Sequence, residues 1–144
     1  MPKLKLSTKG RYGLRAVFEI GLKYGEEPVS IKTISENQGI SENYLEQLFK
    51  NLRKEGIVKS TRGAKGGYEL TKHPSLVKVS DVMNALEGSS KILECIDDGS
   101  CSREKYCPTR IIWLKVQKSI DDVMDTTTIQ DIIDDYMKNN TGGK

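Results

Sequence analysis

The apolar positions in the first half of the chain recur at the spacing of amphipathic helices. Residues 7–24 gather their apolar side chains on one side of a helical pattern, which Gly25 and Pro28 end. A shorter helix is predicted between Ser30, which is a suitable N-cap, and a turn at residues 36–39. The turn contains Gly39, and a new helix start follows it at once.

This third helix is predicted to begin after Ser41 and to close at Gly56. Its apolar residues follow an i, i+3, i+4, i+7 pattern: Leu45, Leu48, Phe49 and Leu52. Two helices joined by a short turn that contains glycine predict a helix-turn-helix motif. The residues expected on the outward face are Glu42, Asn43, Glu46, Gln47, Lys50 and Arg53, with Tyr44 at its border. Asparagine and glutamine can each form two hydrogen bonds with adenine, so this face suits the major groove; a solvated polar face is the alternative.

Two short β-prone runs, at residues 57–60 and 68–71, flank a loop with three glycines and two cations. This pattern predicts a hairpin that acts as a wing. The glycines would let the loop approach a phosphate backbone closely, with Lys65 beside it and Arg62 in a minor groove. A nucleotide-binding P-loop is excluded, because that motif needs a different glycine spacing before its lysine and a helix after it.

The second half is predicted to be helical as well. A capped helix is expected at residues 80–87, and a long helix from Pro108 carries Ile112, Val116, Ile120 and Val123 along one side. A last amphipathic helix is expected at residues 129–137. The apolar surface of the long helix is broader than a small domain covers by itself, which favours self-association; packing within one subunit is the alternative. The predicted fold class is therefore mainly α with a small β-hairpin wing: a winged helix-turn-helix followed by a long dimerisation helix.

The distribution of charged residues divides the chain near residue 80, where the predicted winged helix-turn-helix ends. The net charge of +3 combines 15 Lys and Arg against 8 Asp and Glu in residues 1–80 with 8 against 12 in residues 81–144. A basic half suits a polyanion, although a solvated basic face would have the same composition. With a helix-turn-helix and a wing in that half, the sequence favours binding to double-stranded DNA. We expect a DNA-binding domain over residues 1–80 and a sensor and dimerisation region over residues 81–144.

Three cysteines, Cys95, Cys101 and Cys107, are evenly spaced, with five residues between each pair, in the segment between the helices expected at residues 80–87 and from Pro108. The start of the chain lacks a signal peptide and no run is long and apolar enough to cross a bilayer, so we expect the cytoplasm and no membrane. In that reducing compartment, thiols are more typical of metal or redox sites than of disulfides, and an odd number cannot pair internally. The spacing itself matches neither zinc sites nor ferredoxins, and reduced cysteines in a loop are the simplest alternative.

Three segments together resemble a known family: LSTKGRYGLRA, ISENYLEQLFKNLRKEGIVKSTRGAKGGYEL and the three-cysteine loop. They are similar to the IscR, NsrR and CymR group of bacterial winged-helix regulators, over nearly every residue to about 138. The resemblance implies a homodimer on a palindromic operator, with the long helix of each subunit crossing its partner. It also implies that Ser41, Asn43, Tyr44 and Gln47 read or position the major groove and that Arg62 enters the minor groove. Glu46 is similar to a glutamate that tunes site preference in IscR.

The same resemblance implies an iron-sulfur cluster, either 2Fe-2S or 4Fe-4S. Cys95, Cys101 and Cys107 match the three cysteine ligands of IscR and NsrR, whereas CymR-like members lack the full set. The fourth ligand is undetermined, because Arg110 stands where IscR has a histidine and Arg11 where some NsrR proteins have an aspartate, and arginine stays protonated. Candidates are Asp97, Asp98, Glu104, Thr8 of the partner subunit or a small molecule. His73, the sole histidine, is expected in a solvent-facing turn.

The sequence therefore predicts a dimeric transcription regulator, expected to act as a repressor, whose cluster occupancy changes its affinity for DNA. We expect the signal to pass through the cysteine loop to the helix that begins at Pro108. Direct oxidation of the thiols without a cluster is one alternative. A DNA-binding module with structural zinc is another. An enzyme is not expected, because the chain has neither a Cys-x-x-Cys redox pair nor a histidine near a nucleophile.

Overall fold

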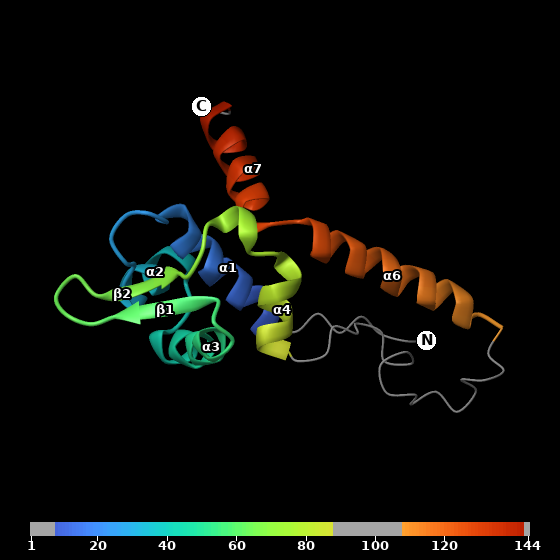
Figure 1. The fold of residues 1–144 in the computed structure, drawn as a ribbon, viewed down its shortest axis with the longest axis horizontal. Coiled ribbons are helices and arrows are strands. Elements are labelled where there is room, and N and C mark those ends of the chain that lie inside the picture. The colour runs from blue at the N-terminus through green and yellow to red at the C-terminus, as the bar shows by residue number, and fades with distance from the viewer. Residues whose placement is uncertain (1–7, 88–107, 143–144) are drawn as a thin grey trace.

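A computed structural model describes residues 8–87 and 108–142 of the chain (Figure 1). The elements in chain order are α1 (Thr8–Leu22), α2 (Ile31–Gln38), α3 (Glu42–Lys54), β1 (Val58–Thr61), β2 (Gly67–Leu70), the 3-10 helix η1 (Pro74–Leu76), α4 (Val79–Glu87), α6 (Arg110–Thr126) and α7 (Ile129–Gly142). The predicted fold class is confirmed: the described part is mostly helical, with one two-stranded antiparallel hairpin. The three cysteines lie outside the described residues.

The turn between α2 and α3 forms as the capping pattern predicts. Ser30 Oγ accepts a hydrogen bond from the backbone N–H of Thr33 at 3.1 Å, and Ser41 Oγ accepts one from that of Tyr44 at 3.2 Å. Gly39 ends α2 with φ at 67°, a left-handed conformation that glycine adopts without a steric penalty. Both helices thus begin on a serine cap, and the chain reverses between them in three residues, 39–41.

Helix α1 lies at the centre of the fold, packed against α4, α7 and the wing. Its glycines allow this packing. A Cβ atom at Gly13 would run into Leu86 of α4, and one at Gly10 would run into Met83 and Glu87. The segment KGRYG, identified above only by resemblance, therefore has a structural role. Its two glycines let the backbone of α1 come close to α4.

The boundaries of the later helices differ from the prediction. Helix α4 starts at Val79 rather than at a capping Ser80, because the Asp81 carboxylate accepts the backbone N–H of Lys78 at 3.0 Å and so caps the first turn. Val79 also donates its N–H to the carbonyl of Thr127 at 2.9 Å, which fixes this start against the α6–α7 connection. Helix α6 begins at Arg110, after a turn at residues 108–109, and α7 continues to Gly142 rather than ending at residue 137.

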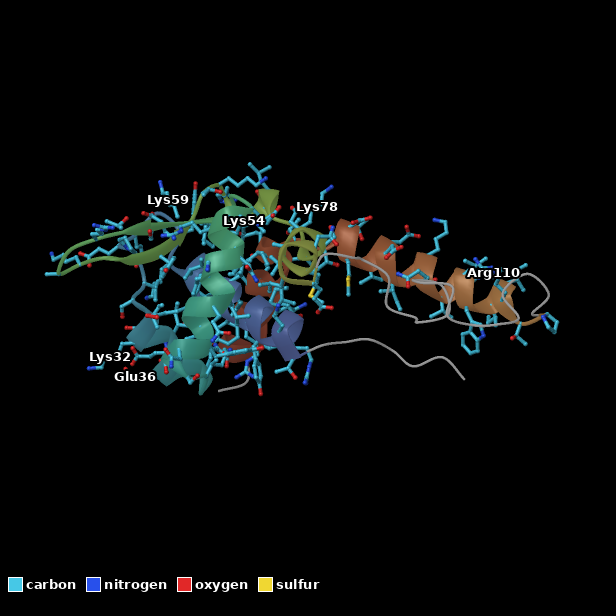
Figure 2. The ribbon with its side chains drawn as sticks, turned by 90° about the horizontal axis from the view of Figure 1, so that it is seen from below. Lys32, Glu36, Lys54, Lys59, Lys78 and Arg110 are labelled. Atoms are coloured by element: carbon cyan, nitrogen blue, oxygen red, sulfur yellow. The ribbon has the colours of Figure 1, made fainter. Side chains whose placement is uncertain are left out.

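Helix α6 extends away from the rest of the molecule, and Arg110 lies at its distant end (Figures 1 and 2). Its apolar residues are largely uncovered: Ile111 is 63% exposed and Val123 is 62% exposed. Its one buried side chain is that of Gln117. Helix α7, in contrast, packs on α1, where the rings of Phe18 and Tyr136 meet edge to face with centroids 5.1 Å apart. Among the residues that the structure describes, α6 therefore has exposed apolar side chains that no other element covers.

Within the described residues, no helix is both long and apolar enough to span a membrane.

Candidate nucleic-acid interface

Helix α3 separates its apolar and polar residues onto opposite faces. Leu45, Phe49 and Leu52 are completely buried in the core and Leu48 is buried almost as fully. All six residues that were expected on the outward face are exposed: Glu42, Asn43, Glu46, Gln47, Lys50 and Arg53. A rigid helix therefore presents amide, carboxylate and cationic groups side by side, which is the set of groups that reads base edges and phosphates.

Two side chains at the N-terminal end of α3 are held by contacts within the protein: Ser41 by the predicted cap, and Tyr44 by a ring contact that was not predicted. Ser41 Oγ is used as the helix cap, so its hydroxyl is already hydrogen-bonded within the protein. Tyr44 is half-buried, and its ring meets that of Tyr12 of α1 edge to face, with centroids 6.0 Å apart and planes at 87°. The guanidinium of Arg15 lies over the Tyr12 ring, 5.2 Å from its centroid. Tyr44 is therefore held in place by α1.

A clamp from α1 fixes the turn that precedes α3. Arg15 Nε donates to Gln38 Oε1 at 2.9 Å, and Gln38 Nε2 donates to Glu19 Oε1 at 2.6 Å. The other oxygen of Glu19 accepts from Asn37 at 3.2 Å. The available signal was the i, i+4 spacing of Arg15 and Glu19, which places both on one face of α1. The clamp therefore ties the C-terminal end of α2, just before the turn, to α1.

The wing is joined to α3 by a ring stack and a hydrogen bond. Phe49 and Tyr68 stack with centroids 4.4 Å apart and planes at 13°. Arg53 Nη1 donates to Ser60 Oγ on β1 at 3.2 Å. Arg53 was expected to face outward, and it is exposed, but its guanidinium reaches the wing. These contacts fix the position of the hairpin relative to the polar face of α3.

The hairpin itself forms close to the predicted residues. Val58 pairs with Leu70 and Thr61 with Gly67. The side chains of Arg62 and Lys65 in the loop are exposed, and Lys65 Nζ lies 3.6 Å from Glu27 Oε1 of the α1–α2 loop. This partner of Lys65 was not predicted from the sequence.

Two of the wing glycines serve the packing of the protein itself. A Cβ atom at Gly66 would strike the carbonyl of Thr61 across the loop, and one at Gly67 would strike the backbone of Val29. The backbones of Val29 and Tyr68 exchange hydrogen bonds of 2.9 and 2.8 Å, so the wing base is tied to the α1–α2 loop. Gly63, with φ at 112° and open space around it, is the glycine of this loop that has room for an approaching backbone.

Only some of the positions considered for a fourth metal ligand lie within the described residues. Arg110 is half-buried at the start of α6, and Arg11 is exposed on α1. His73 is exposed in a turn as expected, where its Nδ1 accepts the backbone N–H of Ser75 at 3.1 Å. Over residues 8–87 and 108–142, no group of three or more His, Cys, Asp or Glu side chains is arranged to hold a metal ion.

Comparison with known proteins agrees with this architecture. The family model named Rrf2, described as "Iron-dependent Transcriptional regulator", matches residues 6–135. The transcriptional regulator CymR of Bacillus subtilis is 40% identical over 129 residues, which are 90% of this chain and 89% of that protein.

Two solved structures extend the comparison. IscR of T. potens is 47% identical with a TM-score of 0.76, covering 92% of this chain and 88% of that chain. The oxidized form of CymR from Staphylococcus aureus is 35% identical with a TM-score of 0.75, covering 90% of this chain and 95% of that chain. These are transcription regulators rather than enzymes. The chain therefore belongs to the Rrf2 family of DNA-binding, winged helix-turn-helix transcriptional regulators.

Proposed function

We propose that this regulator is a homodimer that binds a palindromic operator, represses transcription, and changes its affinity for DNA with the state of its three cysteines. The single observation that carries the proposal is the fixed arrangement of two DNA-contacting surfaces, which we call the two readers: the polar face of α3 and the loop of the wing. The polar face of α3 and the exposed loop of the wing are joined through Phe49–Tyr68 and Arg53–Ser60, so they meet DNA as one unit. Such a pair suits a major groove and the minor groove next to it.

Each reader has its own task. Asn43 and Gln47 contact base edges, while Glu46 adjusts which bases are accepted. Lys50 contacts phosphate. Ser41 and Tyr44 position the start of α3, through the cap and the contact with Tyr12.

In the wing, Arg62 enters a minor groove, where the negative potential favours a cation. Lys65 contacts the neighbouring phosphates after leaving Glu27, a partner that holds it weakly because the pair is exposed.

The uncovered face of α6 supports the homodimer. Ile111, Ile112, Leu114 and Val123 are 41–63% exposed on a helix that extends away from its own subunit. A groove between α1 and α7, with apolar walls that include Leu14, Phe18 and Ile132, offers further surface of the same kind. A second copy that covers these surfaces would place two α3 helices about a two-fold axis, which is the symmetry of a palindromic operator. In this arrangement residues 1–80 bind DNA and residues 81–144 sense and dimerise.

The chemistry of the donor set supports an iron-sulfur cluster. Three thiols within 13 residues are the ligand type that such clusters use, and the matched family is described as iron-dependent. When bound, the cluster would supply redox and iron sensitivity. Cys95, Cys101 and Cys107 would hold it. The fourth ligand stays open, because Arg11 and Arg110 at the two positions considered are cations. A regulator of this kind acts in the cytoplasm, where DNA and reduced thiols are found together.

A second function also has support. One matched structure is an oxidized form of CymR, and another is of CymR as the global cysteine regulator of B. subtilis. A cluster-free regulator that responds to oxidation of its own thiols would use the same DNA-binding surface. A third possibility, in which the three thiols hold structural zinc, would make the loop a fixed support rather than a sensor.

Metal and sulfide analysis of protein purified without oxygen separates these functions. The cluster predicts iron and acid-labile sulfide in equal amounts, together with visible absorbance. Zinc without sulfide would indicate a structural zinc site instead of a cluster. Metal-free protein whose operator affinity changes on mild oxidation would favour the regulator that responds to oxidation of its own thiols. Footprinting on selected operators should show inverted half-sites about one helical turn apart, or a multiple of it.

A further inference from the structure

Three exposed lysines near the C-terminal end of α3 lie outside the surface already assigned. Lys54 is in the last turn of α3, Lys59 is on β1, and Lys78 precedes α4. Figure 2 views the molecule with α3 in front. In this view Lys54 lies at one end of α3, between Lys59 and Lys78. Lys32 and Glu36 of α2 lie toward the other end of α3. We call Lys54, Lys59 and Lys78 the lysine row.

The ammonium groups of the lysine row are available. All three residues are exposed, and among the described residues none of the three ammonium groups has a hydrogen-bond or ion-pair partner. This distinguishes them from Lys65, which lies beside Glu27, and from Lys118, whose Nζ lies 3.1 Å from Asp122 Oδ2.

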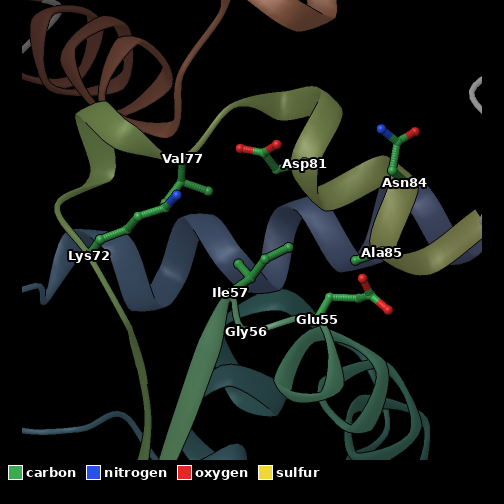
Figure 3. A pocket seen from close by; sticks show the side chains of 8 residues that line it. All are labelled: Glu55, Gly56, Ile57, Lys72, Val77, Asp81, Asn84 and Ala85. Carbon is green, nitrogen blue, oxygen red and sulfur yellow. The ribbon is translucent and has the colours of Figure 1, made fainter.

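Three carboxylates close to the row in the chain or the hairpin form no ion pair with it. Asp81 accepts the backbone N–H of Lys78, and Glu69, opposite Lys59 in the hairpin, accepts from the hydroxyl of Thr61 at 3.5 Å. Glu55 lines a pocket of about 240 Å³ together with Lys72 and Asp81, between the end of α3 and α4 (Figure 3).

The length of α3 places this row beside DNA. The helix has 13 residues, so at about 1.5 Å per residue it spans about 20 Å. The major groove is about 12 Å wide, so a helix that crosses it places its two ends at the two sugar-phosphate walls. The C-terminal end of a helix carries partial negative charge, which phosphate would avoid unless cations offset it. Arg53 is committed to Ser60 of the wing, which leaves Lys54 and its neighbours in the row for that task.

We infer that the lysine row is a second binding site for the DNA backbone, on the groove wall next to the C-terminal end of α3. The inference rests on the proposed docking of α3 in the major groove. The row supplies affinity and orientation without base specificity, because ammonium groups contact phosphates that are alike in every sequence.

The test replaces all three lysines by glutamine and measures binding to operator and to random duplex DNA over a range of salt concentrations. About 0.9 unit of slope in the logarithm of affinity against the logarithm of salt is lost for each phosphate contact. The row variant should therefore lose about 2 to 3 units of slope on both DNAs, with the same fold-loss of affinity on each.

The control carries Lys115→Gln, Lys118→Gln and Lys138→Gln in α6 and α7. It removes the same charge from exposed positions away from α3. Its slope should stay within about half a unit of the parent value. Both triple variants should keep the sedimentation and far-UV signals of the parent.

A row variant with the slope of the parent on random DNA would overturn the inference, as would a loss of affinity confined to the operator. If the parent itself bound operator and random DNA equally, operator recognition by α3 would fail. The slope on random DNA would still decide the role of the row.

Discussion

The ring of Phe49 in α3 stacks on the ring of Tyr68 in β2, with centroids 4.4 Å apart and planes at 13°. Phe49 is completely buried, and the backbone of Tyr68 is hydrogen-bonded to Val29 on its other side. The two readers therefore share a joint inside the core. In a DNA-binding protein, such a joint fixes the distance between the contacts in the major groove and those of the wing.

Weakening this joint should lower the free energy of unfolding only slightly and should reduce operator affinity more than affinity for random DNA. Tyr68→Leu keeps an apolar side chain but removes the stack, which is worth about 0.5 to 1.5 kcal/mol beyond its buried area. We expect urea unfolding to show a loss of about 1 kcal/mol, and operator affinity to fall further than affinity for random DNA. The control is Tyr24→Leu, because Tyr24 is 40% exposed and lies against His73. Equal operator affinity in both variants would mean that the joint does not position the wing.

The cap of α3 can be separated from its contact with DNA. Ser41→Ala removes the acceptor for the N–H of Tyr44 and should lower the free energy of unfolding by about 1 kcal/mol. Ser41→Asp and Ser41→Asn both restore the cap, but only aspartate adds a negative charge next to the DNA. We expect both to be as stable as the parent in thermal unfolding, with DNA binding weakened only by aspartate. If aspartate and asparagine bind DNA equally well, Ser41 lies away from the phosphates.

Arg62 and Lys65 should have different effects, although they lie in the same loop. Arg62→Ala should weaken operator binding by about 1 to 3 kcal/mol and relax specificity, because a cation in the minor groove senses its width. Lys65→Ala should reduce affinity for all sequences alike and flatten the salt dependence. Binding isotherms on operator and random duplexes measure both effects. Equal effects of the two variants on both DNAs would contradict this division.

The ion pair of Lys65 adds a variant that should bind DNA more tightly. Glu27→Gln removes the carboxylate that lies 3.6 Å from Lys65 Nζ, so the lysine no longer has to leave a partner. The pair is exposed, so the gain should be at most about 1 kcal/mol at low salt and should vanish as salt rises. The control adds Glu27→Gln to the Lys65→Ala variant. The gain in affinity over Lys65→Ala alone should be smaller than the gain of Glu27→Gln over the parent. A gain that is the same with and without Lys65 would assign the effect to the loss of negative charge alone.

The proposed dimer can be tested through the uncovered face of α6. Ile111→Glu places a charge on a residue that is 63% exposed in the single subunit, so the fold should tolerate it while the dimer should not. Leu76→Glu is the matched control, because Leu76 is 60% exposed on η1. Sedimentation should show monomers for the first variant and dimers for the second. A dimer of parent strength with Ile111→Glu would show that α6 is not the interface.

The sequence predicted the features of this fold that depend on neighbours in the chain. The caps at Ser30 and Ser41, the apolar period of α3 and the hairpin all result from interactions over a few residues, and all formed close to their predicted bounds. The boundary of α4 was missed because the backbone pairing of Val79 with Thr127 is a contact between distant parts of the chain.

Contacts between elements were the other part that sequence reasoning did not reach. The spacing of Gly10 and Gly13 does not reveal that Met83 and Leu86 occupy the space a side chain would need. Likewise, the pairing of Arg53 with Ser60 depends on how the wing folds back on α3. The predicted positions on the face of α3 were nevertheless correct as exposed residues, since helical periodicity alone decides which side is outward.

We propose that the three cysteines, through an iron-sulfur cluster, change operator binding. The most direct measurement is the operator affinity of Cys101→Ala relative to the parent, both purified and assayed without oxygen. We expect the variant to lose visible absorbance, iron and sulfide, and its operator affinity to shift about tenfold, or about 1.4 kcal/mol, with an unchanged far-UV signal. The neighbouring Ser100→Ala should behave as the parent. A Cys101→Ala protein that keeps its colour and the operator affinity of the parent would show that the cysteines do not control DNA binding.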